Sequence, residues 1–329
     1  MEYLLKVENL KTTFYTDEAI IRAVDGVSFN VRPGEVVGLV GESGCGKSVV
    51  SLSIMRLIKY PPGKIEGGKI LLNDQDLLTV DEKTMRRIRG NEIAMIFQEP
   101  MTSFNPVYKI GDQVSEAIRL HQGLNKDAAW QEAVKMLELV GIPRPGEIIN
   151  DYPHQLSGGM RQRAMIAMAL SCNPKLLIAD EPTTALDVTI QAQILELMKD
   201  LRERINTAII FITHDLGVIA EMADYVVVMY SGKVVENTDV RSLFNKPLHP
   251  YTAGLIKSKP ILEEDKESLE FIPGSVPNPS EMPEGCAFNP RCPEVMDICR
   301  REMPELIESQ PKHLVRCWLY QKQKTEGMT

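Results

Sequence analysis

A glycine-rich loop that ends in Lys47 and Ser48 could bind the phosphates of a nucleotide. The stretch from Gly41 to Ser48 reads GESGCGKS and fits the pattern G-x-x-x-x-G-K-[ST] in full. In such a loop, backbone N–H groups surround the phosphates, the lysine reaches the β and γ oxygens, and the serine hydroxyl binds Mg²⁺. The residues that we expect to contact the phosphates are Ser43, Gly44, Cys45, Gly46, Lys47, Ser48 and Val49.

An acidic pair, Asp180 and Glu181, directly follows the apolar run Leu-Leu-Ile-Ala at 176–179. Carboxylates at the end of a buried strand could hold Mg²⁺ and activate water: Asp180 would bind the ion through water, and Glu181 would polarise the water that attacks the γ-phosphate. An acidic pair at such a position is, taken alone, more often a solvated turn. The phosphate loop upstream favours the metal-binding interpretation.

Short apolar segments position these residues. The run at 36–40 predicts a strand before the phosphate loop, and 47–57 predicts the helix after it. A second buried-strand pattern at 208–212 leads into Thr213 and His214. Residues 4–15 predict an extended segment that carries the aromatic side chains of Phe14 and Tyr15.

A second anion site is predicted at Ser157, Gly158 and Gly159. Serine is a good N-cap for the helix expected over 160–170, and glycines allow backbone N–H groups to approach a phosphate closely. The phosphate loop already surrounds one side of a nucleotide. We therefore expect the second site to serve a nucleotide bound to another subunit, although most Ser-Gly-Gly triplets are plain helix starts.

The order of these motifs resembles the nucleotide-binding subunits of ABC transporters. The resemblance implies an α/β fold, namely a P-loop NTPase head of the ABC type with an α-helical subdomain and, here, a cysteine-containing C-terminal extension. It also implies roles for single residues. Gln98 would touch Mg²⁺ and sense the permease, Asp187 would cross to the partner subunit, His214 would contact the γ-phosphate, and Phe14, rather than Tyr15, would stack on adenine.

The resemblance also implies a domain organisation. The first part of the ATP-binding core would span 1–98, and the second part would span 161–245. The helical subdomain would span 99–160, with the helical spacing of Trp130, Ala133, Val134 and Leu137, and the extension would span 246–329. Three residues are candidates to line a groove for the permease, namely Met101, Phe104 and Val107.

Charge and hydropathy limit the partners and the location. The net charge of −8 argues against binding to nucleic acid, because phosphate backbones attract basic surfaces. The N-terminal residues lack the basic start and apolar stretch of a signal peptide, and no apolar run is long enough to span a bilayer. We expect a peripheral protein at the cytoplasmic face of the cell membrane, attached through permease subunits.

Four of the six cysteines lie near the C-terminus: Cys286, Cys292, Cys299 and Cys317. In a reducing compartment, clustered thiols favour a metal over disulfides, and thiolates suit zinc or an iron–sulfur cluster. Their spacing does not decide between these two, because it lacks both paired C-x₂-C knuckles and the usual ferredoxin runs. A structural staple and a redox or regulatory site are both open roles. Cys172 is expected to be a buried thiol in an apolar helix.

The cysteine segment resembles the extension of oligopeptide and dipeptide importer ATPases, with His-Pro-Tyr-Thr at 249–252 and Cys-x-Phe-x-Pro-Arg-Cys-Pro at 286–293. This resemblance implies a [4Fe-4S] cluster, with zinc or unligated thiols as the alternatives, in an ATPase that powers peptide import by ATP-driven dimerisation. The partners would be two permease subunits, a second related ATP-binding subunit or a second copy, and indirectly an extracytoplasmic peptide-binding protein. Nickel or oligosaccharide import, and a regulatory ABC ATPase without transport, are the alternatives.

Overall fold

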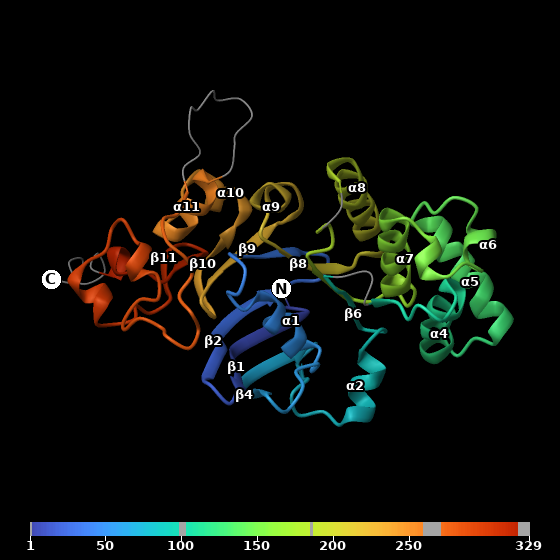
Figure 1. The fold of residues 1–329 in the computed structure, drawn as a ribbon, viewed down its shortest axis with the longest axis horizontal. Helices are drawn as coiled ribbons and strands as arrows, with labels where there is room; N and C mark the ends of the chain where they lie inside the picture. The colour runs from blue at the N-terminus through green and yellow to red at the C-terminus, as the bar shows by residue number, and fades with distance from the viewer. Residues whose placement is uncertain (1, 99–102, 185–186, 259–270, 322–329) are drawn as a thin grey trace. The chain divides into compact units, whose positions relative to one another are not determined.

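The structure is a computed structural model that describes residues 2–98, 103–184, 187–258 and 271–321 (Figure 1). The chain divides into two compact units. The first unit comprises residues 1–4, 31–36 and 79–212, and the second comprises residues 5–30, 37–78 and 213–329. Each unit therefore contains segments that are far apart in the sequence.

Parallel strands form the centre of the first unit. Strand β7 (Leu176–Asp180) pairs in parallel with β6 (Ile93–Ile96) and with β8 (Ala208–Thr213). Every residue of β7 and β8 is buried, which explains why both read as continuous apolar runs. The strands predicted at 176–179 and 208–212 are confirmed.

Helices account for most of the rest of the first unit, and α4 to α7 gather in one bundle (Figure 1). The helix over 126–139 buries one stripe of side chains that includes Ala129, Ala133 and Leu137, which confirms the amphipathic pattern predicted there. The helices are α2 (Glu82–Ile88), α4 (Ile110–Gln122), α5 (Lys126–Leu139), α6 (Pro145–Ile148), α7 (Gly158–Leu170) and α8 (Val188–Ile205).

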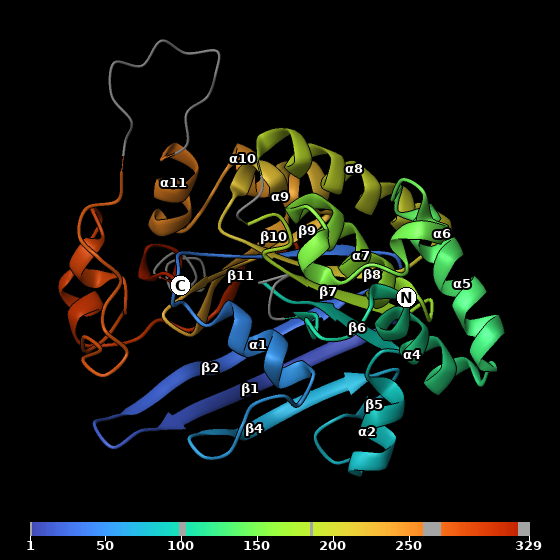
Figure 2. The ribbon, with the colours of Figure 1, turned by 45° about the vertical axis from the view of Figure 1, so that its right-hand side comes forward.

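The second unit contains an antiparallel sheet in the order β2-β1-β4-β5 (Figure 2). Its strands are β1 (Leu5–Tyr15), β2 (Ile20–Val31), β4 (Gly63–Leu72) and β5 (Gln75–Asp76). Buried residues alternate with exposed ones along much of β2, as expected for strands with one face in the core. The extended segment predicted at 4–15 is confirmed as β1.

A second set of strands in this unit has the order β11-β12-β10-β9-β3. Strand β3 (Val36–Val40) runs parallel to β9 (Tyr225–Tyr230), which pairs in an antiparallel hairpin with β10 (Lys233–Asp239). Strand β12 (His313–Val315) pairs with β10 and with β11 (Ile307–Gln310). The end of the chain therefore extends the sheet that begins at the phosphate loop.

Four helices belong to the second unit within the described residues: α1 (Lys47–Ile54), α9 (Leu216–Met222), α10 (Val240–Asn245) and α11 (Pro250–Lys257). Between 271 and 301 the chain is irregular, apart from the 3₁₀ turns η2 (Asn289–Arg291) and η3 (Asp297–Arg300). Proline fixes φ and removes a backbone donor, so a segment this rich in proline cannot extend a helix or a sheet ladder.

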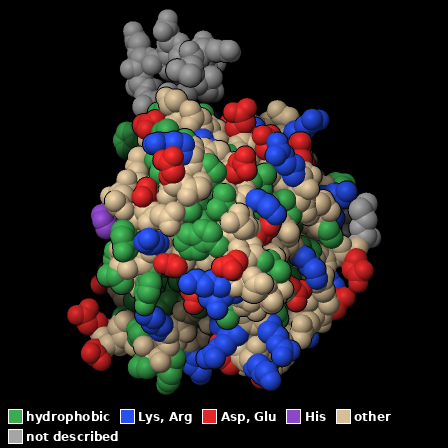
Figure 3. All heavy atoms as spheres, turned by 90° about the vertical axis from the view of Figure 1, so that its right-hand side faces the viewer, with side chains coloured by type: hydrophobic (Ala, Val, Ile, Leu, Met, Phe, Trp, Pro, Cys, Tyr) green, Lys and Arg blue, Asp and Glu red, His purple; other side chains and the backbone are tan. Residues whose placement is uncertain are grey.

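Charged side chains of both signs lie among one another on the face drawn in Figure 3. None of the helices in the described residues is both long enough and apolar enough to span a bilayer. We had expected Cys172 to lie in a helix, and this expectation was wrong: the residue lies just past the end of α7 at Leu170. It is half-buried, and its thiol contacts the backbone carbonyl of Ala117.

Candidate functional site

The phosphate loop lies between β3 and α1 in the second unit, as the sequence predicts. All three of its glycines have positive φ: +150° at Gly41, +79° at Gly44 and +100° at Gly46. A Cβ at Gly41 would lie 2.2 Å from the carbonyl oxygen of Met229, and one at Gly46 would lie 2.2 Å from that of Ala23. Only glycine fits at these two positions, because any side chain would clash with fixed backbone.

The ammonium group of Lys47 is held by the loop itself. Its Nζ donates hydrogen bonds to the carbonyl oxygens of Gly41, at 2.7 Å, and Glu42, at 3.0 Å. Burial raises the pKa of the Cys45 thiol, which leaves this side chain uncharged. Ser43 and Gly44 are exposed at the tip of the loop, while Ser48 and Val49 are half-buried in the first turn of α1.

The candidate adenine-stacking residues sit at the end of β1. Phe14 is half-buried, and its ring lies close to the backbone of Gly63. Tyr15 is 46% exposed, and its hydroxyl donates a hydrogen bond to Glu66. Tyr15 is thus engaged by a neighbouring side chain, and stacking by Phe14 stays a prediction.

His214 directly follows β8 and is exposed. The next residue, Asp215, caps helix α9 by accepting hydrogen bonds from the backbone N–H groups of Gly217 and Val218. The backbone N–H of Asp215 donates to the hydroxyl of Thr213. These local bonds fix the turn in which the imidazole is presented.

In the first unit, Asp180 and Glu181 stand at the end of β7. Asp180 is 4% exposed, whereas Glu181 is half-buried and has a left-handed backbone with φ +46°. The carboxylate of Glu181 accepts hydrogen bonds from Nε2 of Gln98 and from the hydroxyl of Thr184, both at 2.9 Å. The structure thus brings together two residues that were assigned from distant motifs.

Ser157 caps helix α7, as predicted. Its hydroxyl accepts a hydrogen bond from the backbone N–H of Met160 at 3.3 Å. Ser157 and Gly158 are exposed, and Gly159 packs against Ile190 of helix α8. The exposed start of the helix at Ser157 and Gly158 is the part of this predicted anion site that a ligand could reach.

Asp187 has a structural task that the sequence analysis did not assign. It is the N-cap of helix α8, and its carboxylate accepts a hydrogen bond from the backbone N–H of Ile190 at 2.9 Å. The side chain is exposed. Asp187 therefore combines a local capping role with an accessible carboxylate.

Gln162 was missed by the sequence analysis. Its side chain is 1% exposed, and Nε2 donates a hydrogen bond to the carbonyl oxygen of Pro182 at 2.5 Å. This bond connects helix α7, which begins at Gly158, to the residue that follows Glu181. The sequence offers one signal for this role, a polar residue just before the apolar part of α7. A single glutamine in such a position is too common to be assigned a function from sequence alone.

The four C-terminal cysteines line one small cavity in the second unit. His249 and Phe288 line the same cavity. Burial raises the pKa of three of the thiols: Cys286, Cys292, to about 11, and Cys317, to about 12. Within the described ranges, no group of three or more His, Cys, Asp or Glu side chains meets the distances needed to hold one metal ion.

The candidates for the permease groove differ in exposure. Phe104 is 2% exposed, so its ring belongs to the core of the first unit, whereas Val107 is 71% exposed. Met101 lies outside the described residues. Of the described candidates, Val107 has the accessible side chain that a docking surface needs.

Comparisons with known proteins agree with this arrangement. A family model described as "ABC transporter" matches residues 24–184, and one described as "Oligopeptide/dipeptide transporter, C-terminal region" matches residues 235–299. The solved dimer of the ATP-binding cassette MJ0796 bound to ADP and Pi is 28% identical, with a TM-score of 0.65 over 72% of this chain and 99% of that chain. The fold and the motifs define an ABC-type ATPase, whose activity requires ATP and Mg²⁺.

Curated relatives narrow the assignment. The oligopeptide transport ATP-binding protein AppD of Bacillus subtilis (strain 168) is 56% identical over 99% of both chains. The dipeptide transport ATP-binding protein DppD of Escherichia coli (strain K12) is 54% identical over 92% of both chains. The chain belongs to the oligopeptide and dipeptide transporter family of ABC ATP-binding subunits, which act with membrane permeases.

Proposed function

We propose that this chain hydrolyses ATP to power the import of dipeptides or oligopeptides through a membrane permease. AppD and DppD match almost the whole chain, and both are named as peptide transport proteins. These relatives support peptides as the cargo over nickel or oligosaccharides. The match of residues 235–299 to a peptide-transporter C-terminal region supports the same cargo. An ATPase that matches transport proteins along its length is also better explained as a transporter subunit than as a regulatory protein.

The residues of the phosphate loop would bind the β- and γ-phosphates, with Lys47 exchanging its two carbonyl partners for phosphate oxygens. Mg²⁺ prefers oxygen ligands, and the oxygen donors assigned to it are Ser48, Gln98 and Asp180. Phe14 would stack on the adenine. His214 would hold the γ-phosphate in the geometry required for attack.

The contact between Gln98 and Glu181 is the observation that carries the mechanism. In the structure, the Glu181 carboxylate, which we expect to polarise water, accepts hydrogen bonds from Gln98 and Thr184. If Gln98 turns to Mg²⁺ when ATP binds, the Glu181 carboxylate regains the capacity to accept a proton from water. Because Gln98 would also sense the permease, the same movement would couple hydrolysis to transport.

Two ATP-binding subunits would close on two ATP molecules. The N-terminus of α7, with Ser157, Gly158 and Gly159, would bind the γ-phosphate of the ATP held by the other subunit, and Asp187 would cross the interface. Closure would turn the permease outward, and hydrolysis would reopen the dimer.

The partners would be two permease subunits, a second related ATP-binding subunit, and an extracytoplasmic peptide-binding protein acting through the permease. Nucleic acid would not be a partner. The chain would lie at the cytoplasmic face of the membrane.

Replacing Glu181 with Gln tests this mechanism. The amide keeps the size of the side chain but cannot accept a proton, so we expect ATP to bind while hydrolysis falls by about 10²-fold or more. The trapped species should be a dimer by light scattering in MgATP, with the related second subunit added. Glu196→Gln, at an exposed position on α8, is the matched control. A Glu181→Gln protein that binds ATP yet stays monomeric would contradict the closed dimer.

We further propose that Cys286, Cys292, Cys299 and Cys317 hold a [4Fe-4S] cluster. Support comes from the donor set, because four thiols line one cavity beside a segment with little regular structure. The four thiolates would hold the iron of such a cluster, whereas the described residues contain no group of three or more His, Cys, Asp or Glu side chains placed to hold a single ion such as zinc. The cluster would supply a covalent staple for the segment from 271 to 317.

Metal analysis of protein purified without oxygen tests the cluster. We expect about four irons and four sulfides per chain, with a visible absorption band. Cys317→Ser should lose the iron, and Cys172→Ser, which changes a thiol in the first unit, should keep it. Stoichiometric zinc without iron would replace the cluster by a zinc staple, and the absence of both metals would refute a metal site.

A further inference from the structure

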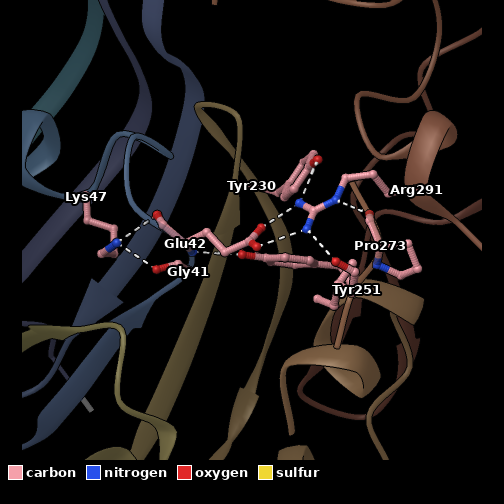
Figure 4. A network of polar contacts seen from close by, with 8 residues as sticks. Gly41, Glu42, Lys47, Tyr230, Tyr251, Pro273 and Arg291 are labelled. Carbon is pink, nitrogen blue, oxygen red and sulfur yellow. Dashed lines mark hydrogen bonds and ion pairs between the residues drawn. The ribbon is translucent and has the colours of Figure 1, made fainter. Parts of the chain in front are cut away.

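Glu42 is the acidic residue of the phosphate loop. Its side chain is held by the C-terminal segment, by which we mean the chain from residue 246 onward (Figure 4). The guanidinium of Arg291 donates to both carboxylate oxygens of Glu42, at 2.6 Å and 3.0 Å. Such a two-pronged pair fixes orientation as well as charge. The pair joins positions that are 249 residues apart in the sequence.

Arg291 is built into its position. Its side chain is 4% exposed, and it also donates to the carbonyl oxygens of Pro273 and Ile272. Its guanidinium lies over the ring of Tyr230, with the carbon 5.9 Å from the ring centre. The hydrogen bond to Glu42 raises the pKa of Arg291, so the group keeps its charge. A buried cation with this many fixed partners cannot follow Glu42 if the loop moves.

The backbone of Glu42 is held as well. Its N–H donates a hydrogen bond of 2.8 Å to the hydroxyl of Tyr251, which is fully buried in helix α11. Its carbonyl oxygen accepts the hydrogen bond from Lys47. Tyr251 packs edge-on against Tyr230 at 4.7 Å and against Phe288 at 5.4 Å between ring centres. The C-terminal segment therefore fixes the side chain and the backbone of one residue in the phosphate loop.

We propose that Arg291 and Tyr251 are positioning residues for nucleotide binding, which keep the Glu42 carboxylate neutralised and turned away from the phosphates. This inference rests on the proposed role of the loop as the ATP site. A carboxylate free to move within the loop would repel the anionic phosphates, and its effect would grow with the number of phosphate charges. Pairing with a buried arginine removes that repulsion without removing the residue.

A thermodynamic cycle on the full-length chain tests this proposal. Arg291→Ala should weaken binding of MgATP by about tenfold, the effect of one unit charge near a partly exposed site, and weaken adenosine by less than about twofold. Glu42→Gln alone should stay within about threefold of the wild type, because it adds no negative charge near the phosphates and Arg291 keeps its hydrogen bonds to Pro273 and Ile272. The double variant Glu42→Gln with Arg291→Ala should recover most of the lost affinity, since no carboxylate remains to be masked.

Arg300→Ala is the matched control, because it removes an exposed arginine from the same segment. Tyr251→Phe tests the second contact while keeping the ring, and it should weaken MgATP by about threefold through the lost acceptor for the Glu42 N–H. Should Arg291→Ala not fold, Arg291→Lys, which keeps the charge but not the fork, replaces it and should fall between the wild type and the loss expected for alanine.

Each result decides the proposal. Equal loss of ATP and adenosine in Arg291→Ala, or no recovery in the double variant, would show a general structural effect and overturn the positioning role. Wild-type affinity in Arg291→Ala would overturn it as well. If the wild-type chain itself failed to bind ATP, the proposed function would fall, whereas ATP binding with no effect of Arg291 would refute this inference alone.

Discussion

Single residues of the phosphate loop are held in place by both nearby and distant parts of the sequence. Nearby backbone carbonyl groups leave no room for a side chain at Gly41 and Gly46. Lys47 donates hydrogen bonds to carbonyl oxygens of its own loop. Glu42, by contrast, is oriented by Arg291 and Tyr251 from the other end of the chain. The conformation of the phosphate loop thus depends on residues that its own motif does not contain.

His249 should make the stability of the second unit depend on pH. Burial lowers the pKa of its imidazole to about 4, against opposing effects from the charge of Glu236 and from a backbone hydrogen bond with Arg316; the charge of Arg316 lowers the pKa slightly further. The unfolded chain takes up the proton near pH 6.5, so stability is lost as pH falls below that value. We expect the free energy of unfolding to drop by about 2 kcal/mol between pH 8 and pH 5 from this group.

Urea unfolding at the two pH values checks this expectation. Asparagine is a good N-cap, so His249→Asn keeps an acceptor for the backbone N–H of Tyr251 but cannot titrate. The variant should lose the pH-dependent part while showing a cavity cost at both pH values. An equal pH dependence in the two proteins would assign the effect to other groups.

Residue-level prediction from the sequence worked where a motif has fixed spacing. Ser157 could be assigned as an N-cap because capping depends on residues within one helical turn. The Glu42–Arg291 pair could not be found, because no local pattern links positions so far apart. Gln162 lay within reach of a known motif, but its partner, the carbonyl of Pro182, is visible only in the folded chain.

At the scale of elements, helix α8 makes the two roles of Asp187 separable. Asp187→Ala should remove the cap and lower the free energy of unfolding by about 1 kcal/mol, whereas Asp187→Asn should keep the cap and stay within about 0.5 kcal/mol of the wild type. Thermal unfolding measures this difference. If Asp187 also crosses to a partner subunit, both substitutions should weaken the ATP-dependent dimer formed by Glu181→Gln. Dimerisation that follows stability alone would leave Asp187 as a cap only.

The existence of strands and helices was easier to predict than the residues at which they begin and end. The buried strands β3, β7 and β8 are continuous apolar runs, so their existence followed directly from the sequence. Helix α7 begins at Gly158 and ends at Leu170, which leaves Cys172 in the turn beyond it. The end expected at residue 170 is confirmed, but the expectation that Cys172 lies in a helix was wrong, because a residue just after a helix can be half-buried as well.

At the scale of the whole molecule, the cysteine cavity should decide whether the irregular segment is ordered. The segment from 271 to 301 has two 3₁₀ turns but no strand or longer helix in the described structure, so it depends on side-chain contacts and on the proposed cluster. Removing the metal with a chelator should therefore speed proteolytic cleavage within 271–301 by about tenfold or more, while the rest of the chain resists.

Mass spectrometry of the fragments locates the cleavage sites. Cys317→Ser should be cleaved at the same rate with or without the chelator, because the site is already incomplete. Unchanged resistance of the metal-free wild type would mean that the aromatic contacts of Phe288 and the Arg291 pair hold the segment unaided.

The pairing of β12 with β10 has a consequence for how the protein avoids self-association. Without β11 and β12, the outer side of β10 would present unpaired backbone donors and acceptors, a template to which strands of other chains can add. The structure ends the sheet instead with β11, a strand of only 4 residues that carries Glu308. A chain cut at residue 299, where the transporter family match stops, would expose that edge and should aggregate even with its phosphate loop intact.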